Sequence, residues 1–423
     1  MKRVTQPVVA RGTMLSAVAA VAALAALLAL APLASAASDP IASGTTTVKL
    51  NKGFVKKLKQ YNVKVLKLSP AGVKGSTVTL PVSGGSLDPV TGLGSVEHSG
   101  GIKFKAGKKS AAVNTLVLDT TTASLSAKVA GKSMKFATVK GFTVARNGFG
   151  ANVSVSSLKL TGKAAKQLNK KLGFSGQKKG KGKGKAKGHK RAAASKAAQP
   201  PFKGNQVLGG SSSETQPKTV GVVATGNAQL VLSDAALAKL KNVGPHPPNE
   251  PGPFAVKLAP VSPTQVVSLS PVTAVFPISG GTMGPTATAG VLQTAGGLQL
   301  TQNLEAAGGG ETTLVMGNIW VDLGAKTASV EVTITNPKTP EANLGNLGRA
   351  SIADVNLTGA TIVSDPATRT VSVQNASATL QAVTAETLNS VFINPIEKAT
   401  KEPQTKFAGG DPLGVFSFAA QTE

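Results

Sequence analysis

The sequence predicts a mainly β protein with two homologous antiparallel β-sandwich or barrel-like domains, minor short helices and a disordered basic linker. Three observations lead there. Residues 80–104 recur at 276–300, apolar and polar residues alternate with period two, and a Lys/Gly run separates the two copies. The composition agrees, because 47 Gly, 25 Pro and only 4% aromatic residues favour turns and aliphatic strands over long helices.

The N-terminal segment has the pattern of an export signal. Lys2, Arg3 and Arg11 precede an apolar run over 14–33, which ends in the small-x-small sequence at 34–36. We expect a signal peptide over 1–36, cleaved after Ala36. The alternative is an uncleaved anchor, since about 20 apolar residues just span a bilayer. The mature chain is therefore expected to be secreted or associated with the cell surface.

The internal repeat is the most informative feature. The two copies match at a constant offset of 196 without a gap. Glycine and proline make up most of the identities, and each such residue usually serves a turn, a bulge or a close backbone approach. The identical pairs are Pro81/Pro277, Ser83/Ser279, Gly84/Gly280, Gly85/Gly281, Pro89/Pro285, Gly94/Gly290, Gly100/Gly296 and Gly101/Gly297.

The resemblance continues on both sides of these segments. Asn51 and Ser233 are expected helix N-caps, because their side chains can accept a first-turn N–H. Asp119 and Asp322 match at a strand end, where a turn hydrogen bond is expected. Each unit should open with a strand and a short helix, and close with a strand and a second short helix. The matching segments are 50–58 with 232–240, 116–129 with 319–332, and 160–173 with 380–392.

Period-two alternation between the helices predicts antiparallel sheet with one buried face. We expect domain 1 over 44–174 and domain 2 over 219–420. Residues 415–418 also alternate. Since they have no evident counterpart in domain 1, they are expected to form an added closing strand.

Residues 175–218 are predicted to be a disordered Lys/Gly-rich linker. The stretch 176–191 holds seven Lys and one Arg, with no apolar side chain larger than Ala. It cannot bury enough surface to offset its ordering entropy. Its charge either keeps the segment solvated and extended or contacts a polyanion.

Charge is unequal between the halves. Residues 41–174 carry 21 Lys and one Arg against three acids, whereas 219–423 carry ten bases against fourteen acids. A nucleic-acid partner is not expected, because a recognition helix, a zinc finger and an aromatic stacking platform are all missing. The expected partners are anionic cell-wall polymer or lipid headgroups, bound through domain 1 and the linker. No stable transmembrane span is expected after cleavage.

Catalytic motifs are absent from the sequence. It has no Cys, no GxSxG, no HExxH and no phosphate-binding GxxxxGK[ST] loop. His98, His189 and His246 are far apart, so a His-rich metal centre is not expected. We therefore predict no enzyme, no catalytic residues and no metal site, with only a Ser-His-Asp arrangement left open.

Several segments together resemble a known family. They are TVKLNKGFVKKLKQY (47–61), the LPVSGG/FPISGG steps, GSVEHSGGI (94–102) and the later VLD and VSSLKLTG strands. They are similar to the HtaA-type domain of actinobacterial haem-transport proteins, in two divergent copies. The resemblance implies a secreted or cell-surface domain that takes up haem and passes it toward an importer. It also implies a Tyr as iron ligand with a His nearby.

The family's ligand pattern is incomplete here. The family pattern opens with a Trp, a Phe and then a Tyr three residues on, but the opening segment here has Phe54 without a Trp, and the residue three on is Lys57. Domain 2 has Ala236 and Lys239 at those places, and Thr294 in place of His98. Domain 2 therefore cannot use the family's ligand set.

Tyr61 and His98 are the candidate cofactor-binding residues of domain 1. Tyr61 follows Phe54 and Leu58 along one helix face, so it is either a core or rim residue or a phenolate ligand to haem iron. His98 is either a surface residue or a partner of Tyr61 or haem.

Two functions follow from these alternatives. One is an exported, non-catalytic HtaA-like protein that binds haem or another anionic ligand at the cell envelope. The other is a structural or adhesive envelope protein without a haem site, docked through its basic half.

Overall fold

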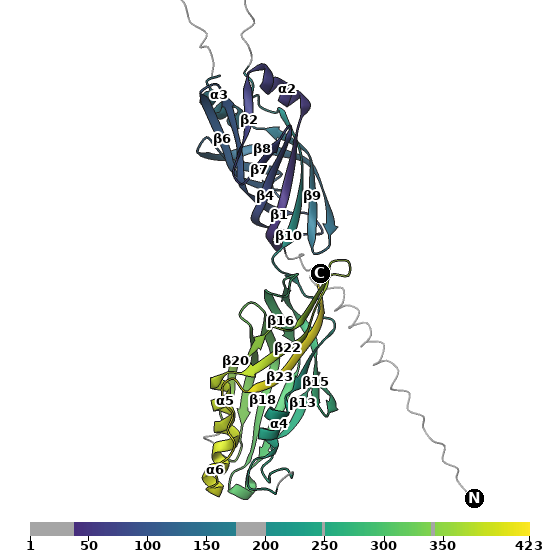
Figure 1. Cartoon of the computed structure of the whole chain (residues 1–423), viewed down its shortest axis with the longest axis vertical. Helices are drawn as coiled ribbons and strands as arrows, with labels where there is room; N and C mark the ends of the chain where they lie inside the picture. The colour runs from purple at the N-terminus through teal and green to yellow at the C-terminus, as the bar shows by residue number, and fades with distance from the viewer. Residues whose placement is uncertain (1–37, 175–199, 248–249, 340–342) are drawn as a thin grey trace, which may run out of the picture. The chain divides into compact units, whose positions relative to one another are not determined.

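The computed structural model describes residues 38–174, 200–247, 250–339 and 343–423 (Figure 1). It is mainly β, with two separate antiparallel barrel-like sheets and few short helices, as the sequence predicts. The predicted signal peptide and residues 175–199 lie outside the described residues. Within the described ranges, no helix combines the length and the apolar composition needed to cross a membrane.

The first domain is a closed ring of eight strands, here called barrel 1. Each strand pairs antiparallel with the next, and β10 pairs with β1 to close the ring. Two short strands lie outside the ring, where β2 (Val63–Leu68) pairs with β5 and β3 (Gly72–Lys74) pairs with β4. The ring strands are β1 (Asp39–Leu50), β4 (Thr77–Leu87), β5 (Gly94–Ala106), β6 (Lys109–Asp119), β7 (Ser124–Val129), β8 (Lys132–Asn147), β9 (Gly150–Leu160) and β10 (Val207–Pro217).

The second domain, barrel 2, closes in the same way through the pairing of β23 with β12. Its ring strands are β12 (Asn227–Leu232), β15 (Val272–Met283), β16 (Gly290–Thr294), β18 (Glu311–Asp322), β19 (Thr327–Thr335), β20 (Gly345–Asn356), β22 (Thr370–Leu380) and β23 (Pro412–Gln421). The additional strands are β11 (Val220–Gly221), β13 (Lys257–Val261), β14 (Gln265–Leu269), β17 (Gly297–Asn303) and β21 (Thr361–Asp365).

Short helices follow equivalent strands in the two barrels. The helices are α2 (Lys52–Gln60) and α3 (Gly162–Leu172) in barrel 1, and α4 (Asp234–Lys241), α5 (Ala382–Leu388), a π-helical turn (Asn389–Ile393) and α6 (Asn394–Thr400) in barrel 2. A 3-10 turn covers Glu305–Ala307. Both predicted N-caps are confirmed. The Asn51 side chain accepts from Gly53 N at 2.8 Å, and Ser233 Oγ accepts from Ala236 N at 3.1 Å.

The repeated glycines hold the same backbone positions in both barrels. Gly85 has φ 109° and Gly281 has φ 113°. A Cβ on Gly85 would collide with the carbonyl oxygen of Ser95, and a Cβ on Gly281 with that of Val291, the residue at the same repeat offset. Only glycine combines this φ with so close a strand neighbour. The backbone conformation and the neighbouring strand therefore require glycine at these two repeat positions.

The structure corrects the predicted linker boundary. Residues 207–217 form β10, which pairs with β1 and β9, so the prediction that 200–218 is disordered is wrong. Domain 1 also begins earlier than 44, because β1 starts at Asp39. The physical reason is non-local, since β1 and β9 would each leave a row of unpaired backbone groups without β10. Segment 175–199 therefore joins α3 to β10 within domain 1, and does not join the two domains.

The structure also corrects the prediction for the closing strand of barrel 2. β23 contains residues 415–418 and occupies the same place in its ring as β10 does in barrel 1. It is therefore part of the repeat, and the expectation of an added strand is wrong.

A side-chain amide anchors the residues before each closing strand. Asn169 donates to Phe202 O at 2.8 Å and accepts from Phe202 N at 3.3 Å. Asn389 makes the same two bonds with Phe407, at 2.9 and 2.8 Å. The shared Leu-Asn step of the repeats thus holds a buried Phe in the core of each barrel.

The matched aspartates also act as predicted. Asp119 Oδ1 accepts from Thr122 N at 2.8 Å. Asp322 Oδ1 accepts from Gly324 N at 2.9 Å and from Ala325 N at 2.8 Å. Both carboxylates therefore stabilise a turn between two strands.

Candidate functional site

Tyr61 lies at the rim of barrel 1, directly after α2. Its half-buried ring packs edge-on against Phe174, with ring centroids 5.8 Å apart and an interplanar angle of 85°. Phe54 and Leu58 are buried as the helical stripe predicts, whereas Tyr61 is at the end of that stripe. Tyr61 is therefore a partly exposed aromatic residue at the rim of the barrel.

His98 lies inside barrel 1, on β5, and is only 5% exposed. Its Nδ1 donates to Leu116 O at 3.1 Å, and its Nε2 is 2.6 Å from Thr46 Oγ1. Thr46 Oγ1 in turn lies 2.8 Å from Ser213 Oγ. Burial lowers the pKa of His98, although the bond to the Leu116 carbonyl acts in the opposite direction. The surface position considered for His98 is therefore wrong.

Tyr61 and His98 do not meet. Val63, two residues after Tyr61, pairs with Ala106, and His98 lies eight residues before Ala106 on β5. At about 3.3 Å per residue, that separation is on the order of 25 Å. His98 is enclosed by Thr46 and Leu116 instead. The described residues therefore do not fit a haem held by Tyr61 with His98 in support.

The same place in barrel 2 lacks this polar network. Thr294 takes the position of His98, and its Oγ1 donates to Ile319 O at 3.1 Å. Strand register puts Ala228 and Phe418 where barrel 1 has Thr46 and Ser213. Sequence reasoning missed Thr46 and Ser213, because nothing local marks one hydroxyl in a Thr- or Ser-rich strand as buried.

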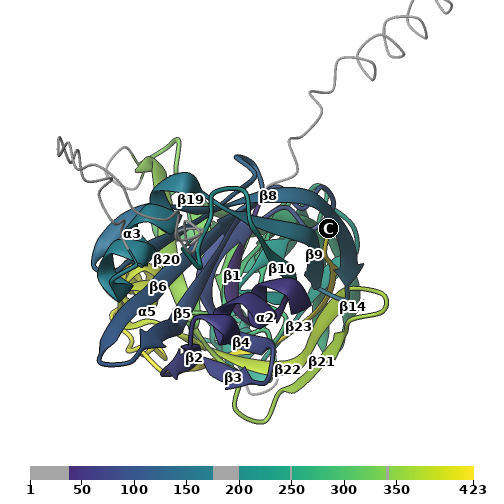
Figure 2. The same cartoon turned by 90° about the horizontal axis from the view of Figure 1, so that it is seen from above.

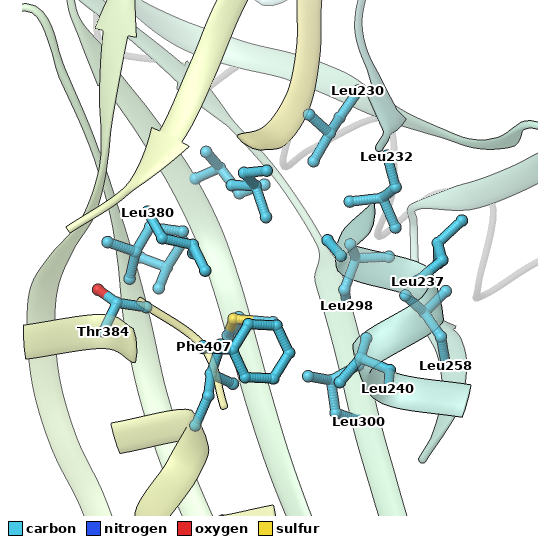
Figure 3. A pocket seen from close by; sticks show the side chains of 17 residues that line it. Leu230, Leu232, Leu237, Leu240, Leu258, Leu298, Leu300, Leu380, Thr384 and Phe407 are labelled. Atoms are coloured by element: carbon cyan, nitrogen blue, oxygen red, sulfur yellow. The ribbon is translucent and has the colours of Figure 1, made fainter. Parts of the chain in front are cut away.

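An apolar cavity lies in the interior of each barrel. In barrel 2 its volume is about 70 Å³, and Figure 3 shows leucines of α4 and the strands facing Phe407 across it. In barrel 1 the equivalent cavity is about 50 Å³. Phe54, Phe104 and Phe202 form an edge-to-face cluster beside it. Neither cavity has an exposed polar surface that would orient a polar ligand.

Charge in barrel 1 is divided between its two ends. Strand directions put α2, α3, the loops at 107–108 and 130–131 and the segment 200–206 at one end, here called the basic end. Figure 1 shows α2 and α3 together there, and Figure 2 looks onto α2. Of the 22 lysines in the described part of barrel 1, 21 lie in the half nearer this end, eight of them on the two helices, and Lys140 lies near the middle of β8.

The helix lysines are Lys52, Lys56, Lys57, Lys59, Lys163, Lys166, Lys170 and Lys171. The others are Lys49, Lys64, Lys67, Lys74, Lys103, Lys105, Lys108, Lys109, Lys128, Lys132, Lys135, Lys140, Lys159 and Lys203.

The carboxylates of barrel 1 lie in the other half. They are Asp39 at the start of β1, Asp88 after β4, Glu97 near the start of β5, Asp119 at the end of β6 and Glu214 late in β10. The ion pairs found among the described residues are all in barrel 2. The basic end therefore has a dense positive charge without carboxylates of its own, an arrangement that attracts anions.

Other chemistry finds little support in the described ranges. They contain no cluster of three or more His, Asp or Glu side chains placed to hold a metal ion. Asp88, the one carboxylate that is buried among the described residues, accepts from Val90 N at 2.8 Å and from Thr91 N at 3.2 Å and so stabilises a turn.

These features define a class of protein, a tandem of two closed β-barrels with a basic end on the first. None of the known family models matches the chain, and neither does any curated protein sequence. Among solved structures, the C-terminal domain of HtaA from Corynebacterium glutamicum is similar, at 13% identity and a TM-score of 0.32. The match covers 48% of this chain and 98% of that one.

A domain-swapped dimer of a variant of the same HtaA domain is also similar. It is 16% identical, with a TM-score of 0.24, and the match covers 40% of this chain and 84% of that one. Both matches are to the C-terminal domain of HtaA.

Proposed function

We propose that this chain is an exported, non-catalytic envelope protein that docks the basic end of barrel 1 onto an anionic polymer. The observation that carries the proposal is the separation of charge in barrel 1, with 21 of its 22 lysines in one half and its five carboxylates in the other. Export rests on the signal-peptide pattern of residues 1–36.

The density of charge supports a polymeric partner. Lysine ammonium groups act as hydrated point charges on flexible stems, and they suit a repeating anion better than one shaped ligand. Phe174 and Pro200 both lie at the basic end, and the segment between them contains nine more basic residues. The lysines therefore present a multivalent surface, for which weak contacts add up.

A lipid surface is less well matched. Among described residues at the basic end, the large hydrophobic side chains with appreciable exposure are Leu66 at 36% and Val207 at 37%. Insertion into a membrane interface is favoured by larger apolar or aromatic groups. A bilayer would therefore be held by charge alone.

The test is co-sedimentation of residues 37–423 with purified anionic cell walls. Attraction between exposed charges is screened as the Debye length falls from about 10 Å at 0.1 M salt to about 3 Å at 1 M. We expect binding at low salt and release at high salt. Walls stripped of anionic polymer, and vesicles of anionic lipid, serve as separate arms.

A matched pair of variants locates the surface. Changing Lys163, Lys166, Lys170 and Lys171 of α3 to Gln should weaken wall binding about tenfold or more, since each near-surface basic residue contributes about 1 kcal/mol. Changing the exposed barrel 2 residues Lys241, Lys257, Lys326 and Lys338 to Gln alters net charge equally and should leave binding unchanged.

Equal effects of the two variants, or binding that ignores salt, would contradict the proposal. Haemin titration tests the other candidate function, haem carriage. A Soret band that appears with haemin and is lost in Tyr61→Phe would favour haem carriage over polymer docking.

A further inference from the structure

In barrel 2, a lysine forms an ion pair with a carboxylate at the end of the barrel where α4 lies. Lys239 Nζ lies 2.5 Å from Asp411 Oδ2 and also donates to Lys406 O at 2.9 Å. The same Asp411 oxygen accepts from Ala408 N at 2.8 Å. Lys239 Nζ is 5.6 Å from the centre of the Phe407 ring. A carboxylate is thus held by an ammonium group and one backbone N–H.

Barrel 1 builds the same turn before its closing strand. Asp411 N donates to Ala408 O at 3.2 Å, and Gln206 N donates to Lys203 O at 3.3 Å. The third residue of each turn has a left-handed backbone conformation, with φ 61° at Asn205 and 88° at Gly410. Residues 203–206 and 408–411 are therefore structurally equivalent.

The lysine is equivalent as well. Lys57 lies six residues after the N-cap Asn51, and Lys239 lies six residues after the N-cap Ser233. Both helices follow the first ring strand of their barrel. Lys239 contacts Asp411 of its turn, and Lys57 is close enough to the equivalent turn for the charge of Lys203 to act on it.

The difference lies in the charges around that lysine. Gln206 replaces Asp411, and its Oε1 accepts from Lys203 N at 3.0 Å, just as Asp411 accepts from Ala408 N. Lys203 replaces Ala408. Barrel 1 thus keeps the turn but exchanges a negative group for a neutral one and adds a positive one.

Lys57 is half-buried, and its pKa is lowered by burial and by the nearby charge of Lys203. The carboxylates among the described residues of barrel 1 all lie in its far half. The charge of Lys57 is therefore not neutralised by a carboxylate from its own barrel.

We infer that Lys57 and Lys203 form a discrete oxyanion site, which takes a phosphate or carboxylate group where barrel 2 holds the Asp411 carboxylate. This inference rests on the proposed function, because it names the contact through which the basic end grips one anionic group of a polymer. The surrounding lysines supply the remaining, less specific attraction.

The experiment uses residues 37–423 with isotope-labelled lysine, followed by NMR at constant ionic strength. Inorganic phosphate and acetate are titrated separately, and the Lys57 signal is assigned by its loss in Lys57→Gln. We expect a saturable shift of that signal. A preference for phosphate indicates a phosphodiester polymer, and a preference for acetate indicates a carboxylate polymer.

Two variants test the comparison between the barrels. Gln206→Asp brings the carboxylate of barrel 2 into barrel 1 and should weaken phosphate or acetate binding at Lys57 at least tenfold. The same turn already accommodates Asp in barrel 2, so the variant is expected to fold. Gln167→Glu on α3 makes the same change in net charge at the same end and should leave binding at Lys57 intact.

Failure of this inference is distinct from failure of the proposed function. A Lys57 signal that does not saturate, or that responds equally in Gln206→Asp, overturns the oxyanion site even if wall binding persists. Absence of wall binding in the parent chain overturns the polymer-docking function even if Lys57 binds phosphate.

Discussion

Barrel 1 and barrel 2 share one backbone plan but differ in interior and in surface. Both close eight strands, anchor a buried Phe with an Asn and use matched glycines. Barrel 1 then has a buried polar network around His98 and a lysine-dense end, whereas barrel 2 has Thr294, Ala228 and Phe418 at the same interior place and paired charges outside. Backbone requirements were retained while side-chain chemistry diverged.

The aromatic content of the two interiors shows this divergence. Barrel 1 packs Phe54 against Phe104 and Phe202, and barrel 2 has Ala236 and Leu300 at the first two places. The smaller side chains at these two places agree with the larger cavity of barrel 2, which is about 70 Å³ against about 50 Å³ in barrel 1. Each barrel also has its own spectroscopic reporter, because Tyr61 is the single Tyr and Trp320 the single Trp.

The largest effects are expected from the matched glycines. Gly85→Ala and Gly281→Ala should each destabilise their own barrel by about 4 kcal/mol or more, because a methyl group would separate two paired strands at a positive φ. Urea unfolding followed by Tyr61 near-UV dichroism and Trp320 fluorescence measures the two barrels separately.

Gly131→Ala is the control for the glycines. Gly131 also has a positive φ, 86°, but among the described residues no heavy atom beyond its chain neighbours lies within 4 Å of the position that an alanine methyl group would take. Its cost should be about 1 kcal/mol. If Gly85→Ala proves as mild, the close strand contact does not explain why the repeat keeps glycine there.

Removing an aromatic side chain from the interior of barrel 1 should have the next largest effect. Phe54→Ala makes that position identical to Ala236 of barrel 2, and we expect a loss of about 3–4 kcal/mol in the unfolding free energy of barrel 1. Tyr61 dichroism should report the change while the Trp320 transition stays in place. A loss under about 1 kcal/mol would show that the aromatic cluster is not what packs this interior.

His98→Thr should remove one contribution to the pH dependence of barrel 1 that has no counterpart at Thr294 of barrel 2. Burial lowers the folded-state pKa of His98, so the unfolded chain binds a proton more readily. The contribution of His98 to the stability of barrel 1 should therefore fall as pH drops below about 6.5, the ordinary His pKa. Unfolding at pH 8 and pH 5 measures this difference.

The His98→Thr variant should lose about 2 kcal/mol at pH 8, because Thr46 loses its partner and a void forms, but its stability should vary less with pH. Barrel 2, with Thr294 at that position, is the internal reference. An unchanged pH slope in the variant would mean that another group is responsible.

The smallest expected effect concerns the ion pair of barrel 2. Burial acts to raise the pKa of Asp411, but the hydrogen bonds from Lys239 and Ala408 N and the charge of Lys239 together lower it. The stabilisation is thus present above about pH 3.9 and is lost as pH falls through the lower folded-state pKa. Asp411→Gln should cost barrel 2 about 1 kcal/mol near neutral pH.

The ion-pair prediction is checked by urea unfolding followed by Trp320 fluorescence at pH 7 and pH 2.5. The difference between parent and Asp411→Gln should shrink at the lower pH, because Asp411 binds a proton more readily in the unfolded chain than in the folded one. A difference that is the same at both pH values would show that the charge of Asp411 does not stabilise barrel 2.

The sequence by itself determined the features that depend on neighbouring residues. The repeat, the period-two strands, the N-caps Asn51 and Ser233 and the turn aspartates Asp119 and Asp322 all follow from local backbone needs, and the structure confirms them. A cap or a turn is satisfied within about four residues, so its signal stands in the chain itself.

Tertiary structure alone decided the rest. It assigned 207–217 to barrel 1, enclosed His98 with Thr46, separated Tyr61 from His98 and placed Lys57 near Lys203, where barrel 2 pairs Lys239 with Asp411. Each of these facts depends on strand register between segments far apart in sequence. A shift of one residue in register would turn every side chain of a strand to the other face, so burial and partners are decided only when the ring closes.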